Sequence, residues 1–273
     1  MIKRTVVGRL FRDSGAFGQL TPPPGLEGTI GDPDWDFFSK LPPRFDFLEL
    51  CDRVGHAFEM SESPISPSDW EDQFESQKER LLALSGCSDG HGIVLLPGLL
   101  PVAPGDCIRK SLFNVYIPAV ERGYGAIYPK RAFEDWCDGR ADSVAAFPGV
   151  GHEHLIHLAS KGLVAVFVYI AHCMRAWPVS TQRRLPRKLF KSNFSLAGGC
   201  DTLSVLSLHP DILAAGFCSP TIELSALQTD SPRLSICVVP EDKRLRLDIW
   251  GNPDDFAPEA SGGLSFWKEQ PVF

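Results

Sequence analysis

The sequence predicts an α+β fold in which helices pack on a mixed, largely antiparallel sheet. Residues 233–239 and 244–250 flank a short polar turn and predict a C-terminal β-hairpin, because the second run alternates apolar and charged residues. Residues 163–171 are apolar and rich in β-branched side chains, which is typical of a central strand covered on both faces. Two amphipathic stretches, 45–58 and 66–84, predict helices.

The N-terminal part begins with a predicted strand at 3–11 and a loop around the Pro22–Gly25 run, where prolines remove backbone donors. Apolar residues then recur at helical spacing in the first predicted helix: Phe47, Leu48, Cys51, Val54 and Phe58.

The start of the second predicted helix is marked by its capping residues. Ser66 suits the N-cap, Pro67 the first helical position and Asp69 the acidic position of a capping box. One stripe of this helix carries Trp70, Phe74, Gln77, Leu81 and Leu84.

The middle of the chain alternates short predicted elements with breaks. Residues 92–96 predict a buried strand, and the proline- and glycine-rich stretch 97–105 predicts a loop. We expect strands at 111–117 and 125–128 and a short helix at 129–137. A predicted turn at 148–151 precedes a predicted helix over 152–161. Residues 201–208 suit either a strand or the start of a helix. Residues 264–267 predict a last edge strand.

Length and composition indicate one domain over residues 1–273, with a possible seam at 97–105. Hydrophobic residues make up 44% and charged residues 22% of the chain, as in ordinary globular proteins. No apolar run has the length of a secretory or membrane-spanning segment. The eight cysteines are spread without a CxxC pair, which predicts free, mostly buried thiols in a cytoplasmic protein.

Charge is distributed unevenly along the chain. The formal net charge is -7, which makes nucleic-acid binding an unlikely function and favours a basic partner. Residues 27–79 contain 14 acidic and 4 basic residues, a local balance of -10.

Histidines and thiols offer the candidate chemistry. His152, His154 and His157 lie close together, with His172 beyond the following strand, but Ile156 occupies the position where an HExxH zinc motif needs its second histidine. These histidines therefore define an alternative function, a hydrolase with or without a metal.

No other catalytic or cofactor motif is present. Cys87 and His91 share a glycine-rich loop, and the basic segment 175–191 suits either a solvated connector or a contact to an acidic partner or RNA. G-x-S-x-G, Walker A and G-x-G-x-x-G patterns are absent. We expect no catalytic residue, metal or cofactor.

Aromatic residues ringed by carboxylates form the candidate partner-binding site. The aromatic side chains supply area that a partner can bury, and the carboxylates steer a basic protein surface towards them. The alternative is that the acids mark two helix N-termini whose tryptophans face the core. The candidate residues are Asp32, Asp34, Trp35, Asp36, Asp69, Trp70, Glu71 and Asp72.

In general character the acidic, motif-poor chain is similar to bacterial immunity proteins that neutralise nuclease-type toxins. This similarity covers no particular residues, so no site residue is carried over from it. It implies a cytoplasmic, non-enzymatic protein that binds a basic protein partner. A structural or assembly subunit is the third possibility.

Overall fold

The computed structural model describes most of the chain beyond residue 43. The described residues are 20, 44–85, 94–103, 107–137, 144–161, 165–185, 189, 193–216, 219–231, 234–250, 253–254 and 259–267. Among these residues, no helix combines the length and apolar character that crossing a membrane requires.

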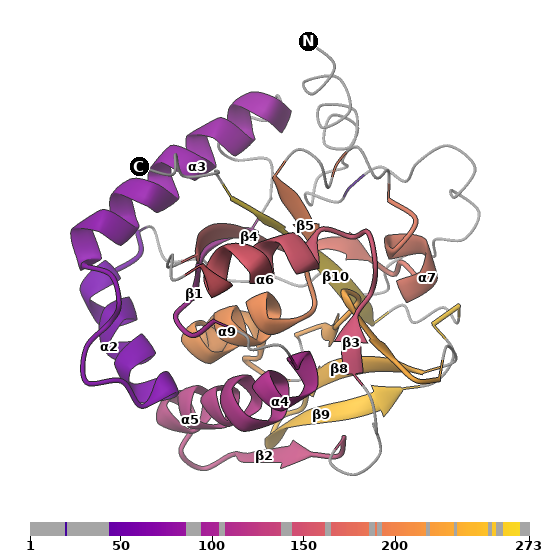
Figure 1. Cartoon of the computed structure of the whole chain (residues 1–273). Coiled ribbons are helices and arrows are strands. Elements are labelled where there is room, and N and C mark those ends of the chain that lie inside the picture. The colour runs from indigo at the N-terminus through magenta and orange to yellow at the C-terminus, as the bar shows by residue number, and fades with distance from the viewer. Residues whose placement is uncertain are drawn as a thin grey trace.

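A mixed sheet of eight strands forms the centre of the protein (Figure 1). The strand order is β1-β4-β10-β6-β8-β9-β2, and β5 also pairs with β10. Five of these pairings are antiparallel and two are parallel, which confirms the predicted α+β fold. A second, two-stranded sheet pairs β3 with β7. The strands are β1 (Val94–Leu100), β2 (Ala132–Asp135), β3 (Val144–Ala146), β4 (Ala165–Arg175), β5 (Phe194–Leu196), β6 (Thr221–Glu223), β7 (Leu227–Thr229), β8 (Ser235–Pro240), β9 (Arg244–Trp250) and β10 (Ala260–Phe266).

Helices cover this sheet. The 19-residue α3 packs on β4, α9 packs on β1, and α2 contacts α3, α5 and α9 (Figure 1). All nine residues of α9 are buried, which resolves the ambiguous stretch 201–208 in favour of a helix. The helices are α2 (Phe47–Phe58), α3 (Pro67–Ser85), α4 (Ile108–Ser111), the π-helical η2 (Leu112–Tyr116), α5 (Ile117–Ile127), α6 (His152–Ser160), α7 (Val179–Gln182), α9 (Cys200–Leu208) and α10 (Pro210–Leu213).

The predicted central strand and the C-terminal hairpin are both confirmed. β4 lies between β1 and β10, antiparallel to both, and its residues from Val166 to Arg175 are buried. β8 pairs antiparallel with β9, and Leu245 and Leu247 point into the core as the alternation predicted. The alternation identified β9, because strand faces repeat every two residues, and the unbroken apolar run identified β4 as a strand covered on both faces.

Four predictions for shorter segments are wrong. Residues 111–117 and 125–128 lie in the continuous helical stretch α4–η2–α5, because its apolar side chains bury against α9 at helical spacing. Residues 132–135 form β2 instead of a helix, since they pair with β9. The last strand, β10, lies inside the sheet between β4 and β6, and not at its edge.

The proposed seam at 97–105 is also wrong over its first residues. β1 continues through Pro97 and Gly98 to Leu100, in register with β4. Proline is tolerated there because β1 ends the described sheet, where one row of backbone donors has no strand to bond. Gly98 is needed because a Cβ would come within 2.3 Å of the Phe167 ring.

The crossing of α5 and α9 depends on Gly123. A Cβ at Gly123 would lie 2.1 Å from the carbonyl oxygen of Ser207, whereas a Cβ at Gly125 would meet nothing within 4 Å. We expect Gly123→Ala to lower the free energy of unfolding by about 1–3 kcal/mol through overpacking. The matched Gly125→Ala should raise it by up to about 1 kcal/mol, because alanine favours the helix. Urea unfolding measures both, and a neutral Gly123→Ala would contradict the close crossing.

Candidate partner-binding site

The acidic region forms a corner built by α2, α3 and the loop 59–66 between them (Figure 1). Asp46 caps α2 by accepting hydrogen bonds from the backbone N–H groups of Leu48 and Glu49. The predicted capping box of α3 is confirmed. Ser66 Oγ accepts the N–H of Asp69 at 3.1 Å and donates to the Asp69 carboxylate at 2.6 Å. These caps fix where both helices begin and so shape the corner.

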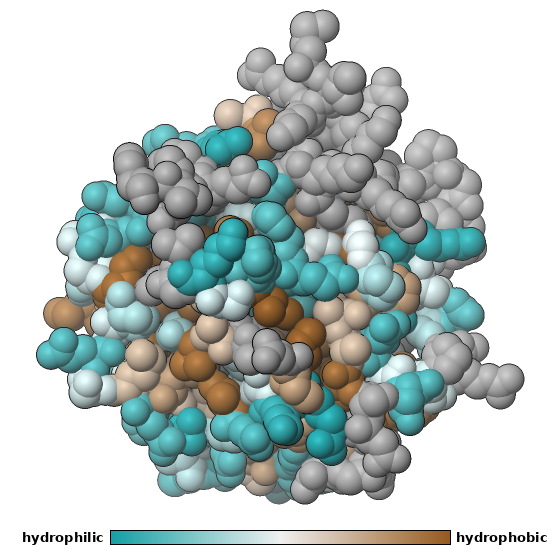
Figure 2. Space-filling model, in the orientation of Figure 1, coloured by the Kyte–Doolittle hydropathy of each residue, from teal (hydrophilic) through white to brown (hydrophobic). Residues whose placement is uncertain are grey.

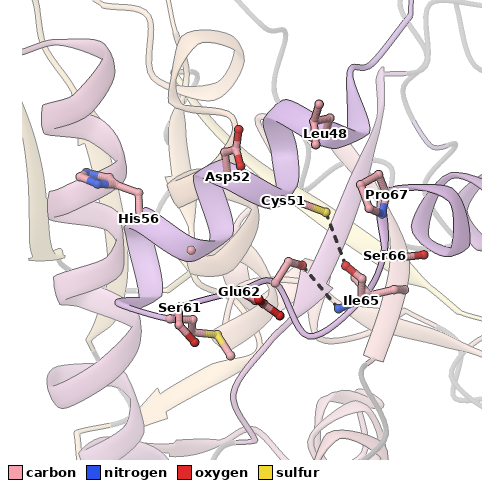
Figure 3. A pocket seen from close by; sticks show the side chains of 12 residues that line it. Leu48, Cys51, Asp52, His56, Ser61, Glu62, Ile65, Ser66 and Pro67 are labelled. Atoms are coloured by element: carbon pink, nitrogen blue, oxygen red, sulfur yellow. Dashed lines mark hydrogen bonds between the residues drawn. The ribbon is translucent and has the colours of Figure 1, made fainter.

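Two hollows in the surface of this corner meet at Leu48. The larger has a volume of about 600 Å³ and lies between α2 and the loop that follows it (Figure 3). The smaller, of about 480 Å³, lies between the starts of α2 and α3. Leu48 and Pro67 line both hollows, and the Leu48 side chain is 63% exposed. Leu48 is thus an apolar contact point on an otherwise hydrophilic corner.

Hydrophilic residues are frequent on this corner, but they do not form one continuous patch. On the face drawn in Figure 2, hydrophilic and apolar residues are interspersed along the flank where α2 and α3 lie in Figure 1. The described residues 44–85 carry ten carboxylates and four Lys or Arg side chains. The local charge is therefore negative even when only the described part of the region is counted.

Several of these carboxylates are neutralised within the chain. Each of four glutamates has a basic partner within 3.5 Å. Exposed pairs of this kind contribute only about 0.2–1 kcal/mol each, so they balance charge more than they stabilise the fold. The pairs are Glu71 with Arg44, Glu49 with Arg53, Glu75 with Lys78 and Glu59 with Arg122.

The structure separates the predicted partner-binding residues. Asp32, Asp34, Trp35 and Asp36 lie outside the described residues. Asp69 and Asp72 are exposed, while Glu71 is half-buried, lines the smaller hollow and pairs with Arg44.

Trp70 is a core residue, and its prediction as a partner-binding anchor is wrong. Its side chain is completely buried, and its ring packs edge-on against Phe47 with 5.8 Å between ring centroids. The physical reason is helical periodicity, because Trp70 shares one face of α3 with Phe74 and Leu81, which are also buried. This is the alternative in which the acids mark a helix N-terminus and the tryptophan faces the core.

Sequence reasoning missed Leu48, Asp52 and Glu62 as surface residues of the corner. Leu48 was grouped with the apolar stripe of α2, but it is exposed while Phe47 and Cys51 are buried. Asp52 is four residues after Leu48 and therefore lies on the same helix face. That spacing is the sequence signal that could have found the pair. Nothing in the sequence placed Glu62 opposite them, since it belongs to the connecting loop.

The histidines do not gather into one site. His154 and His157 are exposed on α6, whereas His152 and His172 are buried. His172 Nδ1 lies 2.8 Å from Ser261 Oγ, and burial next to Arg175 lowers the pKa of His172 to about 3. Within the described ranges no three His, Cys, Asp or Glu side chains are placed to hold a metal ion. The three-ligand group that a metal-dependent hydrolase would need is therefore not assembled by the described histidines.

A buried polar network lies behind α6, centred on Asp201 at the start of α9. Its Oδ1 accepts the backbone N–H groups of Gly198, Gly199 and Thr202, and its Oδ2 accepts the Ser265 hydroxyl at 2.6 Å. His152 Nδ1 is 3.7 Å from Oδ1. The carboxylate thus links α9 to β10 and has no path to solvent, since its side chain is completely buried.

The thiols near this network are not poised as nucleophiles. Burial raises the pKa of Cys173 to about 12, and burial together with the adjacent Asp201 charge raises the pKa of Cys200 further. Both thiols therefore stay protonated at neutral pH, and a protonated thiol is a weak nucleophile. Five of the six described cysteines are buried and only Cys107 is exposed, as predicted for free apolar thiols. Cys87 and His91 lie outside the described residues.

The basic segment 175–191 is largely internal where it is described. Arg175 is buried, and Arg183 donates to the backbone carbonyls of Ser225 and Leu227 while its guanidinium stacks on Phe147 at 4.4 Å. These contacts use Arg183 inside the fold. Arg184 is exposed, and Arg187, Lys188 and Lys191 lie outside the described residues.

Comparison of the chain with protein-family models, with curated proteins and with solved structures found no match. The residues themselves therefore carry the functional assignment. Of the two polar regions, the α2–α3 corner is open to solvent and hollowed, whereas Asp201 and His152 are completely buried.

Proposed function

We propose that this chain is a cytoplasmic, non-enzymatic protein-binding module that captures a basic protein at the α2–α3 corner. One observation carries the proposal: the exposed Leu48 stands between two hollows, within residues 44–85, which bear ten carboxylates against four basic side chains. An apolar contact ringed by charge of one sign suits a partner surface of the opposite sign. Neutralisation of a basic, nuclease-type toxin is the form of capture that this character favours.

The apolar and the charged contacts of such a corner contribute differently to binding. Burying Leu48 against a partner removes apolar surface from water and gives affinity. The exposed carboxylates raise the association rate, and this effect weakens as salt screens the charges over about 8–10 Å. Capture should therefore be salt-sensitive mainly in its association rate.

Charge reversal at the corner tests the proposal. We expect Asp52→Lys with Asp72→Lys to slow association with a basic partner by roughly tenfold or more at low salt, because both exposed aspartates belong to the corner and neither caps a helix. The protein tested as the partner is the product of a neighbouring gene, which is co-expressed and purified. Its association with the chain is followed by surface plasmon resonance at two salt concentrations.

The control keeps the same change in net charge but places it elsewhere. Glu153→Lys with Asp230→Lys alters exposed acids on α6 and after β7. Binding that falls equally in both double variants, or in neither, would rule out capture at the corner. Leu48→Ser adds a second arm and should raise the dissociation rate while leaving the salt dependence unchanged.

A further inference from the structure

The larger hollow has two acidic residues that pair with no basic residue in the described part of the chain. Asp52 on α2 and Glu62 in the following loop both line it (Figure 3). Among the described residues neither carboxylate forms an ion pair, although Glu49 and Glu59 close by are paired with Arg53 and Arg122. The negative charge that remains uncompensated therefore faces this hollow.

Apolar residues form part of the walls of the hollow, beside serines and His56. Leu48, Met60 and Ile65 line it together with Pro67. A lysine or arginine side chain has the matching character, since its methylene stem packs on apolar surface while its charged head meets a carboxylate. The volume of about 600 Å³ is within the range of about 300–1,000 Å³ that is typical of ligand pockets.

The hollow is held open by contacts within the chain. The backbone N–H of Met60 donates to the carbonyl oxygen of Gly55 at 2.9 Å, and the Cys51 thiol donates to the carbonyl oxygen of Ile65 at 3.6 Å. Glu59 ends α2 in the left-handed conformation, with φ of 54°, and so turns the loop back along the helix. A preformed hollow loses little conformational entropy when it is filled.

From this geometry we infer that the larger hollow receives one basic side chain, of lysine or arginine, from the captured protein. The inference rests on the proposed function and adds the contact that gives the corner its specificity. The cation lies between Asp52 and Glu62, and its stem lies along Leu48 and Met60. The occupant is a side chain of a protein partner and not a free metal ion, because no third described His, Cys, Asp or Glu is placed to join the two carboxylates around a metal.

A titration with single amino-acid probes tests the hollow without the partner. The full-length chain, labelled with nitrogen-15, is titrated with Nα-acetyl-lysine methylamide, Nα-acetyl-arginine methylamide and the uncharged norleucine analogue. We expect the backbone amide signals of Gly55, Ser61 and Glu62 to shift with lysine or arginine and not with norleucine. The stronger of the two cationic probes identifies the side chain.

Two double variants decide whether the carboxylates of the hollow are responsible. Asp52→Asn with Glu62→Gln should weaken probe binding by about tenfold, because both charges at the site are lost. Glu153→Gln with Asp230→Asn removes the same charge from exposed positions outside the corner and should leave binding unchanged. Shifts that persist in the first variant, or that never occur, would overturn the inference.

A failure of this inference can be told apart from a failure of the proposed function. If the partner is captured at the corner but no cationic probe shifts the hollow, only the side-chain site is wrong. If the probes bind the hollow but no basic protein is captured, the site stands and the proposed function is wrong.

Discussion

Replacing Asp201 by alanine is expected to lower the free energy of unfolding by about 3–5 kcal/mol, the largest loss that we predict for any single residue of this chain. The substitution leaves three backbone N–H groups and the Ser265 hydroxyl without their acceptor in a completely buried site. Each unsatisfied donor retains its desolvation penalty, because water does not replace the lost carboxylate.

Asp201→Asn provides the informative comparison, since it keeps one acceptor oxygen for the backbone donors. The Ser265 hydroxyl can then rotate to accept from the new amide, so the loss should be clearly smaller than with alanine. Asp230→Ala, at an exposed position, controls for the loss of an aspartate and should change stability by less than about 0.5 kcal/mol. Urea unfolding followed by circular dichroism measures all three. Equal losses for alanine and asparagine would show that charge, and not the hydrogen bonds, determines the effect.

Glu223→Gln is expected to make the unfolding free energy less sensitive to a rise in pH from 4.5 to about 7. Burial raises the pKa of Glu223 from its ordinary 4.5 to about 7, with Glu259 adding to the shift and Arg183 opposing it. A carboxyl whose pKa is raised in the folded state contributes stability that is present below pH 4.5 and lost as the pH rises towards 7. The shift corresponds to a loss of about 3 kcal/mol above pH 7.

The measurement is the difference in unfolding free energy between Glu223→Gln and the unchanged protein, at pH 4.5 and at pH 8. We expect this difference to move in favour of glutamine by about 3 kcal/mol over that interval. Glu79→Gln, on the exposed face of α3, should show no such change. A difference that is independent of pH would mean that folding does not raise the pKa of Glu223.

The variant and the unchanged protein must be compared at each pH, because buried histidines change the unfolding free energy with pH in the opposite direction. Burial lowers the pKa of His172 to about 3 and of His209 to about 4, both from 6.5. Their contribution is present above pH 6.5 and lost as the pH falls through these values. Between pH 6.5 and 4.5, two histidine losses exceed the single gain from Glu223, so the unmodified chain should still weaken in acid.

Patterns with a strong period were predictable from the sequence, and segments defined by distant partners were not. The two amphipathic helices, the apolar strand β4 and the C-terminal hairpin each carry their own periodicity. β1 was predicted too short because its Pro97–Gly98 pair looks like a loop, yet pairing with β4 and contact with Phe167 place it in the sheet. The helical stretch 108–127 resembled strands locally, and only its burial against α9 selects the helix.

The same distinction applies to the candidate site. Acidic composition indicated the region in which the two hollows lie, because charge density is visible in a single sequence. It did not distinguish the buried Trp70 from the exposed Leu48, since that difference depends on which face of each helix meets its neighbours. Glu62 enters the hollow only through the path of the loop, which has no periodic signal.

The contact between α3 and β4 has a consequence for how capture and folding are connected. The Gln77 side-chain amide donates to the backbone carbonyl of Val166 at 3.0 Å and ties the binding corner to the longest strand of the sheet. A partner that binds only the folded corner draws the folding equilibrium toward the native state, by about 2.7 kcal/mol when its concentration is a hundred times the dissociation constant. If the corner and the sheet unfold together, a partner bound at the corner also stabilises strands that it does not contact.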